Sequence, residues 1–188
     1  AGYAITTENS APSEWISSTA TSSTSTNKYG NETYYAWAKD WAGNVSSSKS
    51  VTVSNIETAA PTISVNSNTT VAKSQTGTIT IGDANSGLAA GTYAIKYTWT
   101  TSTQEPTWSN ISTTTSITVE AGAKTGTATI TKNDGTGTYY LHVQGQNIKD
   151  KAGNTSTPSA YGTFKIDNAA PTVTFGTEGN TTYAKSQS

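Results

Sequence analysis

Few residues in this chain could serve as a catalytic base or nucleophile. His142 is the only histidine, and there is no cysteine. A serine-hydrolase site needs a base within hydrogen-bond reach of its nucleophile. Side chains alternate between the two faces of a strand, so His142 is expected to point away from the apolar face of Leu141 and Val143. The sequence therefore predicts that His142 is an ordinary surface residue.

Carboxylates are the other groups that could do acid–base chemistry. A glycosidase needs two of them on one cleft at a fixed separation. The aspartates here are instead scattered over short polar segments, as Asp40, Asp83, Asp134 and Asp150. An Asp in a turn bonds its own backbone. Turn formation accounts for their placement, and we expect no enzymatic activity and, calcium apart, no cofactor.

Calcium takes oxygen ligands from carboxylates and backbone carbonyls. The candidate ligands are Glu57, Asp83, Asp150 and Asp167. Glu57 and Asp167 occupy similar segments of the chain, and Asp83 and Asp150 are expected in loops near one of them. No dense Asp-x-Asp-x-Asp run is present, so the competing interpretation is that these are solvated linker and loop acids.

Aromatic side chains form a candidate ligand surface. Trp41 and Trp108 are expected in loops, where a ring can contact a glycan or a host protein. Trp99 alternates with Tyr97 and Ile95, which predicts a place in the core. Trp41 and Trp108 are therefore the two ligand-binding candidates.

The composition limits the classes of partner. Of the 188 residues 12% are charged, the formal net charge is −1, and all 11 basic residues are lysine. This pattern offers no electrostatic footprint for nucleic acid or for an anionic membrane. The apolar runs fall short of the roughly 18 residues of a membrane span, so no membrane insertion is expected in this segment.

Short segments of the sequence occur twice. KDWAGNVS at 39–46 returns as KDKAGNTS at 149–156, which is 110 positions later (149 − 39). AAPT at 59–62 returns at 169–172 in the same order along the chain. NTTVAKSQ at 68–75 returns as NTTYAKSQ at 180–187, which is 112 positions later (180 − 68). Preserved order with slightly variable spacing indicates homologous units in tandem.

The repeats divide the chain into three parts. Residues 1–55 are the carboxy-terminal part of one unit, 56–167 are a complete unit, and 168–188 are the first strand or strands of the next. Alternating residues between turn signals predict seven strands in the complete unit. These are 61–66, 76–81, 93–100, 116–120, 126–131, 137–144 and 161–166.

The repeated KDxAGN segment lies between the last two predicted strands of a unit. Its Asp can bond its own backbone two residues on, and Gly43 or Gly153 can take a positive φ. We therefore interpret KDxAGN as a chain-reversing loop rather than a catalytic motif.

YYAWAKDWAGNVS, DANSG and KIDNAAPTV together resemble the bacterial immunoglobulin-like repeats of large cell-surface proteins. The resemblance covers nearly the whole chain and implies an all-β fold of tandem immunoglobulin-like antiparallel β-sandwich repeats. It implies an extracellular location on the bacterial surface, in stalks and adhesins that usually have no enzymatic activity. Two departures are an insertion at about 144–148 and Glu57 at the first seam, where the second has Asp167.

The expected function is that of a non-enzymatic structural segment of an extracellular stalk, filament or adhesin. Its partners would be neighbouring repeats or copies of the same protein. Because 169–188 resembles the strands that residues 1–55 lack, one expectation is strand exchange, in which this segment fills the open groove of a neighbouring copy. The alternative expectation is that the same covalent chain continues past both ends. The alternatives are a glycan- or host-binding adhesion module that uses loop aromatics, and a phage fibre domain.

Overall fold

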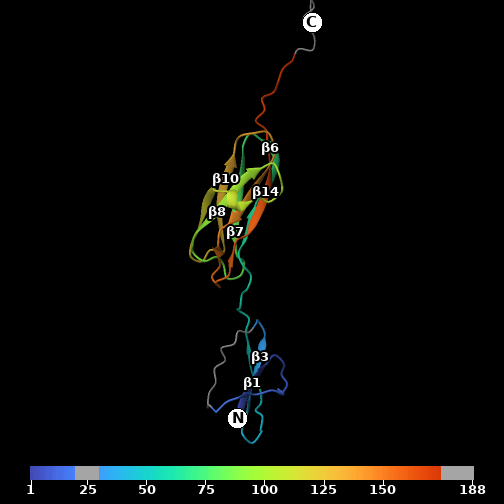
Figure 1. The fold of residues 1–188 in the computed structure, drawn as a ribbon, viewed down its shortest axis with the longest axis vertical. Coiled ribbons are helices and arrows are strands. Elements are labelled where there is room, and N and C mark those ends of the chain that lie inside the picture. The colour runs from blue at the N-terminus through green and yellow to red at the C-terminus, as the bar shows by residue number, and fades with distance from the viewer. Residues whose placement is uncertain (20–29, 175–188) are drawn as a thin grey trace, which may run out of the picture. The chain divides into compact units, whose positions relative to one another are not determined.

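The computed structural model describes residues 1–19 and 30–174, and the chain divides into two units, Ala1–Ala59 and Ala60–Ser188 (Figure 1). The division falls four residues after the expected boundary between 55 and 56. Within the described ranges the only helical element is the 3₁₀ turn η1 at Trp108–Asn110, and no helix could cross a membrane. The all-β prediction is confirmed.

The carboxy-terminal unit consists mainly of two sheets. The three-stranded sheet has the order β10-β7-β5, with β5 at Thr62–Val65, β7 at Gln75–Gly82 and β10 at Thr125–Lys132. The five-stranded sheet has the order β6-β14-β11-β8-β9. Its strands are β6 at Asn68–Ala72, β8 at Gly91–Thr100, β9 at Thr114–Val119, β11 at Gly137–Gly145 and β14 at Ser159–Ile166.

The two sheets share one core because each strand turns alternate apolar residues inward. Ile79 and Ile81 come from the first sheet, and Leu141 and Phe164 come from the second, and all four are fully buried. Trp99 packs edge-on against Phe164 with ring centroids 5.1 Å apart, as predicted for a core tryptophan. Burial of each such side chain contributes about 1.5–3 kcal/mol.

The chain enters and leaves the carboxy-terminal unit at opposite ends (Figure 1). At the near end the Pro61 carbonyl accepts a hydrogen bond from the Ser156 hydroxyl, and Thr62 pairs with Gly82. At the far end β14 finishes beside the start of β11, where Ile166 pairs with Gly137. We call these the near end and the far end of the unit.

The seven predicted strands of this unit are confirmed, but three further strands were not predicted. β6 pairs parallel with β14 at the sheet edge. β12 (Ile148–Lys149) pairs with β13 (Thr155–Ser156) to form a hairpin around KDKAGN. The insertion expected near 144–148 thus contributes the fully buried Ile148 to the core.

The amino-terminal unit contains one sheet in its described residues, with the order β2-β1-β3-β4. The strands are β1 at Gly2–Thr6, β2 at Ile16–Ser17, β3 at Thr33–Lys39 and β4 at Lys49–Thr52. The pairing of β1 with β3 and of β3 with β4 matches the pairing of β8 with β11 and of β11 with β14. Tyr3 pairs with Ala38 where Tyr97 pairs with Val143, and the two tyrosine pairs 34–35 and 139–140 occupy the same register.

The matching registers differ in burial. Val51 pairs with Tyr34 as Phe164 pairs with Tyr139, yet Val51 is 60% exposed and Phe164 is 0% exposed. The difference arises because a second sheet covers Phe164, whereas the described part of the amino-terminal unit has a single sheet. The assignment of 1–55 to part of a sandwich stays a prediction.

The same register corrects one expected equivalence. Since Val51 corresponds to Phe164, Asp167 corresponds to Ser54 and not to Glu57. Glu57 lies in extra residues that the first seam has and the second lacks. The expected strand exchange involves mainly residues beyond 174, which lie outside the described residues.

Candidate functional site

The two KDxAGN segments form the same turn, which confirms the loop prediction. In the first, Asp40 accepts hydrogen bonds from the backbone and side-chain nitrogens of Asn44, each at 2.8 Å. In the second, Asp150 accepts the same two bonds from Asn154, again at 2.8 Å. The glycine before each Asn has a positive φ, 93° at Gly43 and 97° at Gly153. We call these turns the KDxAGN corners.

The carboxylates of both corners are held ionised by these donors. The hydrogen bond from the Asn44 side chain, followed by that from its backbone, lowers the pKa of Asp40. Burial acts to raise the pKa of Asp150, but bonds from the Asn154 side chain and nearby backbone N–H groups more than offset it. The pKa of Asp150 is therefore below its usual value.

The corners differ in what covers them. Asp40 is exposed, whereas Asp150 is 1% exposed. In the carboxy-terminal unit Leu88 forms a β-bridge with Asp150, and the Ala89 N–H donates to the Lys149 carbonyl at 2.9 Å. A loop that follows β7 therefore lies over the second corner.

That loop contains DANSG, and it closes its own turn. The Asp83 carboxylate accepts a hydrogen bond from the Gly87 N–H at 2.8 Å and one from the Ser86 hydroxyl at 3.4 Å. Gly87 has φ of 80°, which explains why glycine suits this position. Asp83 is almost fully buried. DANSG and KDKAGN thus build the near end together.

Two of the four calcium candidates meet in this unit. Carboxylate oxygens of Asp83 and Asp150 lie within 4.8 Å of each other. Asp167 lies at the far end, where its carboxylate accepts from the Ala169 N–H at 2.9 Å. Glu57 belongs to the amino-terminal unit. Within the carboxy-terminal unit, Asp83 and Asp150 are therefore the candidate ligands that lie close together.

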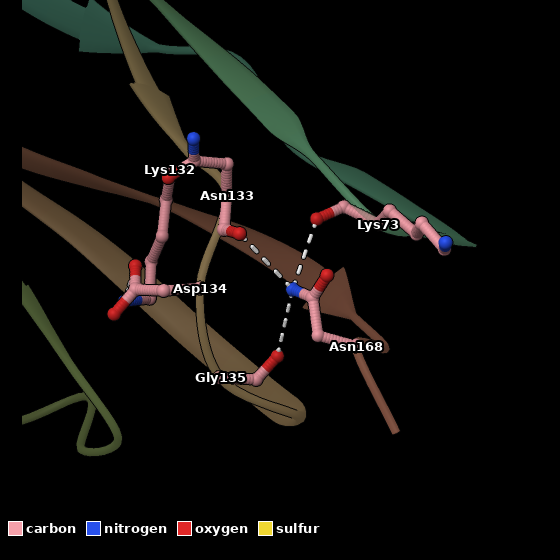
Figure 2. Close-up of polar contacts among 6 residues, drawn as sticks. All are labelled: Lys73, Lys132, Asn133, Asp134, Gly135 and Asn168. Atoms are coloured by element: carbon pink, nitrogen blue, oxygen red, sulfur yellow. Dashed lines mark hydrogen bonds and ion pairs between the residues drawn. The ribbon is translucent and has the colours of Figure 1, made fainter. Parts of the chain in front are cut away.

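A clamp at the far end was not predicted from the sequence. The side-chain nitrogen of Asn168 donates to the backbone carbonyls of Lys73, Gly135 and Asn133, at 3.0, 3.1 and 3.3 Å. Figure 2 shows this nitrogen between the three carbonyls, two from the turn that contains Asn133 and Gly135 and one from Lys73. The contacts tie the segment after β14 to the turn before β11. We call this group the Asn168 clamp.

The nearly buried Gln75 also joins separate elements near the far end. Its side-chain nitrogen donates to the Thr70 carbonyl in β6 at 2.6 Å and to the Lys165 carbonyl in β14 at 2.9 Å. Because Gln75 begins β7, its amide links one sheet to the edge of the other. The sequence carries no signal for this role.

The aromatic candidates lie in different environments. Trp41, in the first KDxAGN corner, is 79% exposed, as expected for a loop tryptophan. Trp108 is only partly exposed, and its indole donates to the Glu105 carboxylate at 2.7 Å. The two residues belong to different units and are separate candidates.

The prediction for His142 was wrong about burial. His142 points away from the Leu141 face as expected, but it is 2% exposed. The chain after β8 folds over that face, and the Ser102 carbonyl accepts a hydrogen bond from the His142 Nε2 at 2.8 Å. The partner of this nitrogen is a carbonyl rather than a nucleophilic hydroxyl.

The chain was compared with protein-family models and with curated proteins. No family model matches it, and no curated protein matches it.

Proposed function

We propose that this chain is a non-enzymatic structural segment of an extracellular bacterial stalk, filament or adhesin, built from immunoglobulin-like sandwich units in tandem. The observation that carries the proposal is that the chain enters the carboxy-terminal unit at the near end, by Pro61, and leaves it at the far end, by Asp167. Units connected in this way add length with each repeat.

The strand order supports the immunoglobulin-like assignment. If β5, β7, β8, β10, β11 and β14 are strands A, B, C, E, F and G, the sheets are A-B-E and G-F-C. This is the partition of an immunoglobulin-type sandwich. β9 beside strand C takes the position of the additional strand C′ of variable-type domains.

The tandem assignment is supported by the second unit's likeness to the first. Both units pair their strands in the same register, and both close the same KDxAGN corner with the same Asp–Asn contacts. Six identities within an eight-residue segment could arise within a loop alone. A shared register over three strands is better explained by homologous repeats.

The edge of the sandwich is suited to bear tension along the array. β6 and β14 run parallel, with Asn68 beside Phe164 and Ala72 beside Ile166. Tension drawn through Pro61 and Asp167 would slide one strand along the other, so that the contacts between them are loaded together rather than opened in turn. Gln75 adds two hydrogen bonds across the same edge.

The proposal is tested by inserting one, two or three extra copies of residues 56–167 directly after position 167 of the natural chain. Small-angle X-ray scattering should give a maximum dimension that grows by a constant increment per copy. Growth that levels off with copy number would contradict a linear array. Antibodies against the segment should label intact cells of the source bacterium.

Calcium binding at the near end is a second proposed role. Asp83 and Asp150 bring two nearly buried carboxylates together, and a divalent cation would relieve the repulsion between them. Ion binding there would stabilise the near end of the carboxy-terminal unit, which complements the structural role.

A further inference from the structure

A pocket lies on the outer face of the five-stranded sheet, away from the KDxAGN corners. Its volume is about 330 Å³, and its lining includes Glu105, Trp108, His142, Ser159 and Tyr161. Three of these residues come from β11 and β14 or their ends, and two come from the segment after β8. The pocket belongs entirely to the carboxy-terminal unit.

The segment after β8 is fixed to the sheet by polar contacts. The Ser102 carbonyl bonds to His142, and the Lys96 side chain donates to the Trp108 carbonyl at 2.8 Å. The 3₁₀ turn η1 then sets the position of the Trp108 indole. These contacts hold the pocket in shape without a ligand, which lowers the entropic cost of binding.

The pocket contains one strong hydrogen-bond acceptor. The Trp108 indole N–H, followed by the Ser159 hydroxyl, donates to the Glu105 carboxylate, and these bonds lower the pKa of Glu105. Glu105 is therefore ionised at neutral pH and has lone pairs left for further donors. None of the residues that line the pocket is a lysine.

Aromatic rings form part of its walls. Tyr161 is 48% exposed, and its ring lies 5.2 Å from that of His142 and 5.8 Å from that of Tyr140. Trp108 adds a second ring from the opposite segment. The rings offer apolar faces, while the hydroxyl and carboxylate groups offer hydrogen bonds.

We propose that this pocket binds the ring of a neutral sugar, such as a hexose or an N-acetylhexosamine. A pyranose ring has an apolar C–H face for Tyr161 or Trp108 and hydroxyl donors for Glu105. The ionised Glu105, with no lysine beside it, disfavours acidic sugars and phosphates. The volume suits a single sugar ring rather than a long chain segment.

The amino-terminal unit has a different arrangement at the corresponding strand position. Trp37 occupies the register position of His142, and its indole donates to the Thr6 hydroxyl at 3.1 Å. The pocket is thus built by residues that distinguish the second unit from the first, and it does not follow from the repeat itself. The sugar proposal and the stalk proposal rest on separate observations.

The test is saturation-transfer NMR of the full chain with a panel of neutral monosaccharides and methyl glycosides at 10 mM. Glucose, galactose, mannose and N-acetylglucosamine form the panel. We expect transfer to at least one sugar, with a dissociation constant in the millimolar range, and a chemical-shift change at the Trp108 indole N–H. Binding should weaken at least tenfold in Trp108→Ala and in Tyr161→Ala.

Val71→Ala is the control, because it truncates an exposed side chain of the same unit outside the pocket, and it should bind as the natural chain does. Tyr161 is half-exposed, so its variant keeps the proposal testable if Trp108→Ala unfolds. Melting curves should confirm that each variant is folded. No transfer to any sugar, or equal binding in Tyr161→Ala, would overturn the proposal.

Discussion

The side-chain nitrogen of Gln75 donates to the backbone carbonyl of Lys165 at 2.9 Å, which links the start of β7 to the end of β14. The same nitrogen reaches the Thr70 carbonyl in β6. One nearly buried side chain therefore contacts both strands of the proposed load-bearing edge, β6 and β14.

Replacement of Gln75 by Ala should destabilise the carboxy-terminal unit. It leaves the Thr70 and Lys165 carbonyls without this donor in a nearly buried setting, which costs about 1–3 kcal/mol. Urea unfolding of the full chain, followed by tryptophan fluorescence, measures the change. Thr76→Ala is the control, since Thr76 makes an exposed hydroxyl contact with Thr131, and it should cost less than about 0.5 kcal/mol.

Asn168→Asp should weaken the contacts between the segment after β14 and the turn before β11. The substitution keeps the size of the side chain but replaces the amide N–H donors of the clamp by an acceptor that faces three carbonyls. We expect a loss of about 1 kcal/mol and faster hydrogen exchange near the turn before β11. Asn133→Asp is the control, because it changes a side chain of the same turn but leaves in place the backbone carbonyl that accepts from Asn168. Hydrogen exchange near this turn that is as slow in Asn168→Asp as in the control would argue against the clamp.

The two KDxAGN corners allow a matched comparison of burial. Asp40→Ala and Asp150→Ala remove the same pair of hydrogen bonds from Asn44 and Asn154. Because only Asp150 is buried, Asp150→Ala should lower the free energy of unfolding by about 2–3 kcal/mol. Asp40→Ala should have a smaller effect. Thermal melts in EDTA measure both variants, and equal losses would contradict the role assigned to the covering loop.

The calcium proposal predicts a change in melting temperature. Extracellular calcium modules bind with dissociation constants of about 10⁻⁴–10⁻³ M, so 10 mM calcium would stabilise the chain by roughly 1.4–2.7 kcal/mol. The melting temperature should therefore rise by several degrees relative to EDTA. Asp83→Asn should abolish the rise, and Asp134→Asn, in an exposed turn, should retain it. Identical melts of the natural chain in calcium and EDTA would remove the basis for an ion site.

The sequence predicted the elements whose residues alternate clearly. The alternation of Ile95, Tyr97 and Trp99 predicted one face of a strand, and all three residues contribute to the core. β6 was missed because all five of its residues are exposed and show no alternation of apolar and polar positions, and the long-range pairing with β14 makes Asn68–Ala72 a strand. Local pattern carries no information about such pairing.

Among the site residues too, contacts within a turn were predicted, and contacts between distant segments were not. Asp40 and Asp150 were predicted to close turns, because a turn depends on neighbouring residues. The approach of Asp83 to Asp150 depends on a loop that crosses to another part of the chain at Leu88. The burial of His142 depends in the same way on Ser102, forty positions away. Contacts between distant segments of this kind cannot be read from alternation or turn composition.

The most direct test of the central claim is to pull the full chain by its two ends in a force microscope. If the carboxy-terminal unit is a load-bearing link, it should resist until one rupture releases roughly 110 residues, or close to 400 Å of extended chain. The force of that rupture should fall in Gln75→Ala. Gradual extension in small steps at low force would show that β14 peels away, and would contradict the account.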